Sequence, residues 1–269
     1  MADSAMAAQP VFTLVLLHGA ASNSTRWWHY ARHTRLGPQW KLLRPDLRGH
    51  AGGDDRGRIG MREWCDDIAA LLDAEGRERA VLCGHSLGAN VALHFAARRP
   101  ERVSALVLVE PVPREALVGW VWRVAPLRPI ASGLALAVRA VNALGLRRRK
   151  LEPMNLEKWD LALQRGEGEL SRYASPISDL RSTPLAAYLQ TFAALVEPLP
   201  DLARIAAPAL VLLSAGRSLT DPARSRAAME RLPRAEIVTI EATHWIPAEQ
   251  PDAMRAAIDG WLTARETES

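Results

Sequence analysis

The pentapeptide Gly84-His85-Ser86-Leu87-Gly88 constrains the fold of this chain more than any other feature. It follows a short apolar run and precedes a helix-like segment that ends at Arg98. A serine at the top of a tight strand-to-helix turn needs neighbours without bulk, because the residues two positions either side of it pass close to other backbone. The two glycines meet that need. The spacing therefore predicts a strand–turn–helix unit that presents Ser86 as a nucleophile.

Strand-like apolar runs alternate with helix-like segments along most of the chain, which is typical of a parallel sheet in an α/β protein. The alternation stops between Pro113 and Leu202, where helix-compatible pieces are interrupted by prolines. We therefore predict an α/β fold with a mostly parallel sheet, helices on both faces and a helical cap insertion. The expected divisions are residues 1–112 (core, first part), 113–202 (cap) and 203–269 (core, second part).

Composition limits the classes of function. The chain has 269 residues, 48% of them hydrophobic, which is enough for one large core. Two cysteines are too few for a disulfide framework. The net charge of +4 comes from scattered arginines, and the one dense basic run, 147–150, predicts a solvated surface. We therefore expect no nucleic-acid partner. The N-terminus lacks the features of a signal peptide and the longest uncharged stretch in the middle is short, so we expect a cytoplasmic protein without stable membrane insertion.

A serine hydroxyl needs a base to take its proton, and seven histidines are available. His244 follows the apolar run 236–240, in the loop after a predicted strand. Ligands of α/β folds bind at the carboxyl ends of parallel strands, where Ser86 also lies. His85 is expected to pack in the turn, and His94 to be carried away by the helix. The position in the chain thus favours His244 as the base.

Acyl transfer also needs preorganised donors for the oxyanion of the tetrahedral intermediate. One is expected to be the backbone amide of Leu87, directly after the nucleophile. The other is expected in the loop after the first strand, where small side chains follow His18, and Ala20 is the candidate. His18 itself is then expected to brace the loop rather than to carry a proton.

Four ordered motifs carry a resemblance to a known family: Leu17-His18-Gly19, the segment 46–52 (Asp-Leu-Arg-Gly-His-Ala-Gly), the pentapeptide 84–88, and His244. The chain resembles the α/β-hydrolase superfamily, in its branch of serine esterases, C–C hydrolases and haloperoxidase-like enzymes. The resemblance covers essentially the whole chain apart from the insertion. It implies a Ser–His–acid triad and acyl-enzyme chemistry. Branches that attack with aspartate are excluded, because position 86 is serine.

The acid of that triad is where the sequence departs from the family pattern. The pattern places an aspartate in a Gly-x-x-Asp arrangement after the strand that corresponds to 209–213, whereas here Gly216 is followed only five residues later by Asp221. Asp221-Pro222 also fits the N-cap of the next helix. The alternative acid is Glu110, at the end of the strand after the nucleophile helix, as in haloalkane dehalogenase-like members. We favour Asp221 on the sequence and keep Glu110 as the competitor.

The resulting hypothesis is a serine hydrolase that cleaves carboxylic esters of small to medium apolar substrates through an acyl-enzyme. The apolar insertion is expected to form the lid and much of the pocket, with Trp120 and Trp122 as candidate substrate-binding residues. The same triad also fits a C–C hydrolase, a thioesterase or a cofactor-free perhydrolase. A non-catalytic ligand-binding protein on this scaffold is the reading from another class. No metal-ligand cluster or phosphate-binding loop is present, so no cofactor or metal is expected. The oligomeric state stays open.

Overall fold

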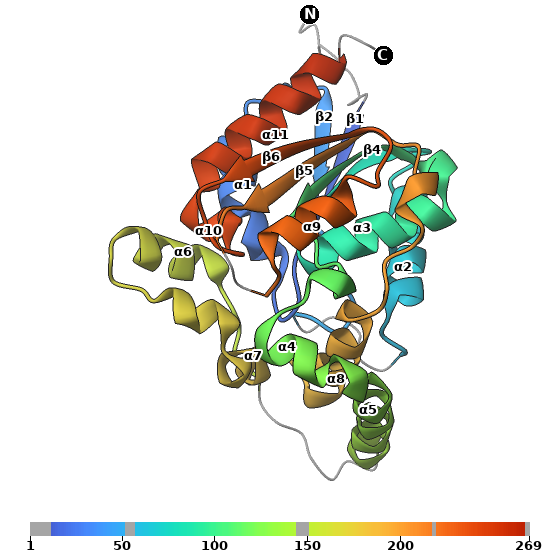
Figure 1. Cartoon of the computed structure of the whole chain (residues 1–269), viewed down its shortest axis with the longest axis vertical. Helices are drawn as coiled ribbons and strands as arrows, with labels where there is room; N and C mark the ends of the chain where they lie inside the picture. The colour runs from blue at the N-terminus through green and yellow to red at the C-terminus, as the bar shows by residue number, and fades with distance from the viewer. Residues whose placement is uncertain (1–11, 52–56, 144–150, 217–218, 267–269) are drawn as a thin grey trace, which may run out of the picture.

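A six-stranded sheet forms the centre of the molecule (Figure 1). The computed structural model describes residues 12–51, 57–143, 151–216 and 219–266. The strand order is β2-β1-β3-β4-β5-β6, and every neighbouring pair is parallel. The strands are β1 (Phe12–Leu17), β2 (Trp40–Leu43), β3 (Ala80–His85), β4 (Val103–Val109), β5 (Ala209–Ser214) and β6 (Ala235–Ile240). The predicted α/β fold with a parallel sheet is confirmed.

Helices cover both faces of the sheet because its central strands are apolar on both sides, as expected for buried parallel strands. The helices α2 (Met61–Ala74), α3 (Leu87–Arg98) and α9 (Pro222–Met229) share one apolar cluster with the side chains of one face. The helices α1 (Trp28–His33) and α11 (Pro251–Glu266) share a second cluster with the other face. The short α10 (Ile246–Glu249) precedes α11.

Residues 113–202 are here called the insertion, and its described residues, 113–143 and 151–202, are mainly helical and lie together at one end of the sheet (Figure 1). The α-helices of the insertion are α4 (Gly119–Val124), α5 (Arg128–Ala143), α6 (Leu156–Gln164), α7 (Pro176–Ser182) and α8 (Leu185–Leu195). Helix α5 packs against α8. The other side of α5 presents apolar side chains to solvent, among them Ile130, Leu134 and Leu136. The basic run 147–150 lies outside the described residues.

One described stretch, Val121–Val141, is long and apolar enough to cross a membrane by length and composition. Its most apolar window is only 17% buried. The stretch comprises α4, a 3-10 turn and α5, and it contains Pro126 and Pro129. A single stretch of this kind is weak evidence for a span. The absence of stable membrane insertion therefore stays a prediction.

Candidate active site

The turn between β3 and α3 is as tight as the pentapeptide predicted. A Cβ atom on Gly84 would lie 2.2 Å from the carbonyl carbon of Gly88, and one on Gly88 would lie 2.3 Å from the carbonyl oxygen of Leu17. Real Cβ atoms do not approach backbone so closely, so neither position accepts a side chain without a shift of the chain. These contacts bring the start of α3 against the end of β1.

Ser86 occupies the apex of this turn in a strained backbone conformation, with φ 54° and ψ −115°. Its N–H donates to the carbonyl of Val109 on the neighbouring strand, at 2.9 Å. A non-glycine residue with positive φ costs on the order of 1–3 kcal/mol and persists only where surrounding contacts impose it. Here the packed strand and helix impose it, and they direct the hydroxyl out of the sheet.

A hydrogen-bonded chain runs from this hydroxyl to a buried carboxylate. His244 Nε2 lies 2.9 Å from Ser86 Oγ, and His244 Nδ1 lies 3.1 Å from Glu110 Oε2. All three side chains are nearly inaccessible to solvent. A carboxylate accepts hydrogen bonds only, so the proton of a neutral imidazole belongs on Nδ1. Nε2 then carries the lone pair that faces the serine.

Glu110 directly follows β4 and, like Ser86, has a positive φ, 50°. Its second carboxylate oxygen, Oε1, accepts the N–H of Ser214 at the end of β5, at 2.5 Å. Two different donors therefore hold the two oxygens. This arrangement holds the carboxylate beside the imidazole of His244.

Asp221, the acid favoured by the sequence, does not occupy this position, and that expectation is corrected. Its carboxylate accepts the N–H of Arg224 at 3.1 Å and caps the N-terminus of α9, where Pro222 is the first helical residue. The two ring nitrogens of His244 face Glu110 and Ser86 instead. The N–H groups at the start of a helix need a hydrogen-bond acceptor, and Asp221 is that acceptor for α9. Glu110, directly after β4, provides the carboxylate that meets His244 instead.

The loop that carries His244 is held on both sides of the histidine. Thr243 donates its N–H and hydroxyl to the carboxylate of Glu249. The carbonyl of His244 accepts from His85 Nε2 at 3.0 Å. His85 is therefore a buried brace for the base, consistent with the packing role predicted for it.

The loop after β1 lies beside the serine and is braced by His18. The Nε2 of His18 accepts the N–H of Leu47 at 2.9 Å, and its Nδ1 therefore donates to the carbonyl of Gly19 at 2.8 Å. Burial lowers the pKa of His18 well below its usual value, so the ring stays neutral. The sequence prediction that His18 braces this loop agrees with these contacts.

A cavity of about 110 Å³ opens next to Ser86. The loop after β1, including Ala20, forms one wall. The insertion forms much of the rest, through Val121, Tyr188 and Phe192 among others. Apolar side chains dominate the wall. The cavity therefore suits a ligand that is largely apolar.

Of the two tryptophans expected in the pocket, Trp122 does not line it. Trp122 is 61% exposed and is absent from the described residues that line the cavity. Val121, one position earlier, faces inward instead and is 4% exposed, because successive helix positions point about 100° apart. The side chain of Trp120 lies outside the described part of the chain.

Several polar residues of the site carried no recognisable sequence signal. Arg26 and Tyr173 line the cavity, and Asp160 binds both of them from α6. Asp179 also lines it, and burial raises the pKa of Asp179 to about 7 although a hydrogen bond from Tyr188 acts in the opposite direction. Each is a single polar residue in a segment with no motif, so only the fold brings them to the cavity.

Within the described residues, no group of three or more His, Cys, Asp or Glu side chains is arranged to hold a metal ion. The expectations about metals and cofactors stay predictions.

Comparisons with known proteins agree with the fold. Residues 14–257 match the model of a family described as the alpha/beta hydrolase family. A thermophilic esterase from Thermogutta terrifontis superposes with a TM-score of 0.69 at 24% identity, covering 95% of this chain and 91% of that one. A putative esterase/lipase of Haemophilus influenzae is 23% identical over 93% of this chain and 82% of its own length.

A 2-hydroxymuconate semialdehyde hydrolase of a Pseudomonas species is 34% identical over 103 residues, 36% of each chain. The chain spans about a third (36%) of the length of the first curated relatives that it matches.

Proposed function

Because the chain belongs to the alpha/beta hydrolase family, we propose that it is a serine hydrolase that cleaves carboxylic esters of small to medium, largely apolar substrates through an acyl-enzyme. The observation that carries the proposal is the hydrogen-bonded chain from Ser86 through His244 to Glu110 beside an apolar cavity. We assign these residues the roles of nucleophile, base and orienting acid, which acyl transfer requires.

In the proposed reaction, Ser86 Oγ attacks the ester carbonyl while His244 Nε2 takes the hydroxyl proton. Glu110 holds the ring through Nδ1 and stabilises the imidazolium that forms. The same Nε2 then returns the proton to the leaving alcohol. Water, activated by His244 in turn, attacks the acyl-enzyme and releases the carboxylic acid.

The oxyanion is proposed to bind the backbone amides of Leu87 and Ala20. Leu87 is the first residue of α3, where unpaired N–H groups and the helix dipole favour negative charge. Ala20 belongs to the loop that His18 braces next to Ser86. The insertion is proposed to act as the cap of the site, because its side chains complete the wall of the cavity.

A fluorophosphonate probe tests the nucleophile directly. We expect the probe to label the wild-type protein on Ser86 and not to label Ser86→Ala. A panel of p-nitrophenyl esters of increasing chain length then tests the substrate class. Labelling that survives in Ser86→Ala refutes Ser86 as the nucleophile, and the absence of labelling from the wild type favours a non-catalytic ligand-binding protein.

A C–C bond hydrolase is the second candidate, because one relative is named a 2-hydroxymuconate semialdehyde hydrolase. The same three residues also serve thioesterases and perhydrolases. Turnover of vinylogous diketones or thioesters, with no turnover of any p-nitrophenyl ester, would replace the ester proposal.

A further inference from the structure

Four residues that line the cavity each have a buried polar side-chain atom with no hydrogen-bond partner among the described residues. The atoms are Ser22 Oγ, Arg26 Nε, His85 Nδ1 and Thr191 Oγ1. Buried polar atoms are rarely left unpaired in folded proteins, and each exception needs an explanation. Their gathering around one cavity favours a ligand that brings polar groups as well as apolar surface.

Arg26 is the charged member of this set. It lies in the 3-10 turn Ser24–Trp27 after β1, and it is only 3% exposed. Its NH1 group lies 3.2 and 3.5 Å from the two carboxylate oxygens of Asp160. These distances exceed the 2.7–2.9 Å that is usual for charge-assisted hydrogen bonds. The guanidinium is thus held in place but only partly satisfied.

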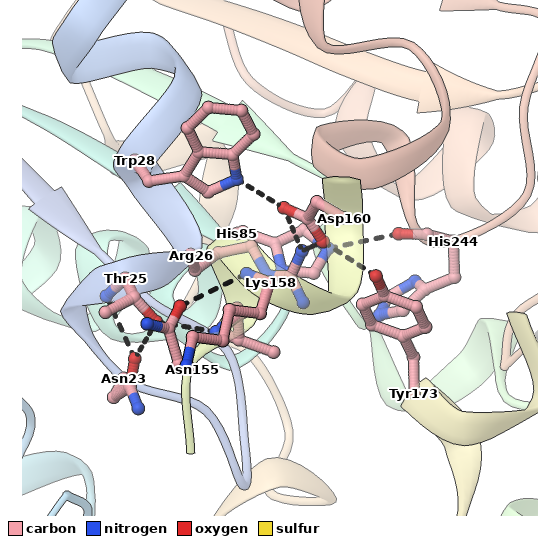
Figure 2. A network of polar contacts seen from close by, with 11 residues as sticks. Asn23, Thr25, Arg26, Trp28, His85, Asn155, Lys158, Asp160, Tyr173 and His244 are labelled. Carbon is pink, nitrogen blue, oxygen red and sulfur yellow. Dashed lines mark hydrogen bonds and ion pairs between the residues drawn. The ribbon is translucent and has the colours of Figure 1, made fainter. Parts of the chain in front are cut away.

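Asp160 is bound more closely by two neutral donors than by Arg26. The hydroxyl of Tyr173 donates to Oδ1 at 2.7 Å, and Nε1 of Trp28 donates to Oδ2 at 2.8 Å. Figure 2 shows the carboxylate between the indole, the guanidinium and the phenol. Asp160 therefore orients the arginine without exhausting its five N–H donors. Donor capacity remains for a group inside the cavity.

Arg26 lines the same cavity as the reacting serine. The loop Gly19–Ser22 and Arg26 both line the cavity that Ser86 enters. The pKa of His85, the neighbour of Ser86, is lowered by burial and further by the charges of His244 and Arg26. Asp160 balances the charge of Arg26, but the planar guanidinium still offers a fork of N–H donors that matches a carboxylate on a substrate bound to Ser86.

We propose that Arg26 binds a carboxylate of the substrate, with the Ser22 hydroxyl as a second donor. The preferred substrates are then esters whose apolar body carries a carboxylate group. This inference rests on the proposed ester hydrolysis and narrows its substrate class. The apolar wall around Val121 and Phe192 accommodates the body of such a molecule, and the guanidinium donates hydrogen bonds to its charged end.

The test compares two esters of equal chain length within each variant. The pair is the 4-nitrophenyl monoester of adipic acid, which carries a carboxylate, and 4-nitrophenyl hexanoate, which does not. A second pair, 4-acetoxybenzoate and phenyl acetate, carries the charge on the alcohol side. We expect Arg26→Gln to lower the charged-to-neutral ratio of kcat/KM by about 10- to 100-fold in one pair, the range for hydrogen bonds to charged groups. A ratio does not depend on the folded fraction of the sample.

The matched control is Arg32→Gln. Arg32 forms another ion pair between the core and α6, with Glu157 at 3.0 Å, but it is exposed and is not among the described lining residues. We expect it to leave the ratio within about twofold. Because Arg26→Gln strands a buried carboxylate, the double variant Arg26→Gln/Asp160→Asn is made in parallel and is expected to lose the same preference. Unchanged ratios in both pairs overturn the proposal and leave Arg26 a structural residue.

A binding measurement separates this inference from the proposed function, because it needs no turnover. Monomethyl adipate and dimethyl adipate are titrated by calorimetry into Ser86→Ala. We expect the monoester to bind at least tenfold more tightly, and Arg26→Gln to abolish the difference. Equal affinities refute the carboxylate site even where ester hydrolysis is observed, and a clear difference supports it even where no ester is turned over.

Discussion

The replacement of Glu110 by glutamine is the sharpest test of the active-site geometry. In the wild type, Oε1 of Glu110 accepts the N–H of Ser214 while Oε2 faces His244 Nδ1. A glutamine has one carbonyl oxygen and one NH₂ group. Two N–H groups cannot face one another, so the oxygen must stay on Ser214 and the NH₂ must face the imidazole. His244 is then forced into the tautomer with its proton on Nε2.

That tautomer cannot accept the proton of Ser86, whose Oγ lies 2.9 Å from Nε2. The loss expected from a wrong tautomer in a triad of this type is about 10³- to 10⁴-fold in kcat, equivalent to about 4–5.5 kcal/mol of transition-state stabilisation. The assay is the initial rate of p-nitrophenyl butyrate hydrolysis between pH 7 and 8, with the thermal midpoint measured on the same samples. KM is expected to change little, because Glu110 does not contact the substrate.

Asp221→Asn is the matched control, since asparagine caps helices about as well as aspartate. We expect its activity to stay within about twofold of the wild type and its stability within a few tenths of a kcal/mol. If Glu110→Gln retains activity within tenfold while Asp221→Asn loses it, the acid is Asp221 and the argument from the ring nitrogens is refuted.

Further expectations concern packing and pH. Gly88→Ala should lower the unfolding free energy, measured in urea titrations, by about 3 kcal/mol or more. Gly260→Ala, in an exposed and open position of α11, should raise it by about 0.5–1 kcal/mol. Equal effects of the two substitutions would contradict the tight turn. Burial lowers the pKa of His50 and His94 to about 4, so the unfolded chain binds more protons below pH 6.5. Unfolding free energy should therefore fall between pH 6.5 and 4, and a flat profile would exclude buried neutral rings. Because burial raises the pKa of Asp179 to about 7, its ionisation should reduce any preference for a carboxylate-bearing ester above pH 7. Asp179→Asn should hold that preference constant with pH.

Much of the fold could be read from the sequence, because it depends on local patterns. The runs 209–213 and 236–240 correspond to β5 and β6 within one residue at each end, and the segment interrupted by prolines is helical where the structure describes it. The pentapeptide around Ser86 carries its own steric requirement for glycine at two positions. The choice of His244 as the base followed from its place after β6, because functional residues gather at the carboxyl ends of parallel strands.

The carboxylate of the site could not be chosen in this way. Both Asp221 and Glu110 follow strands, and the sequence alone ranked them by spacing. The structure separates them because Asp221 caps α9 and accepts the N–H of Arg224, three residues on, whereas the turn after β4 and an N–H of β5 hold Glu110 against His244.

The sequence by itself thus determined the strands, the tight turn and the pair of Ser86 and His244, since each follows from local sterics or from strand order. Tertiary structure alone decided which carboxylate meets the histidine and which side chains line the cavity. The contact of Arg26 with Asp160 joins residues 134 positions apart. A buried charge is stable only where the fold supplies its partner, and no local pattern records a partner at that distance.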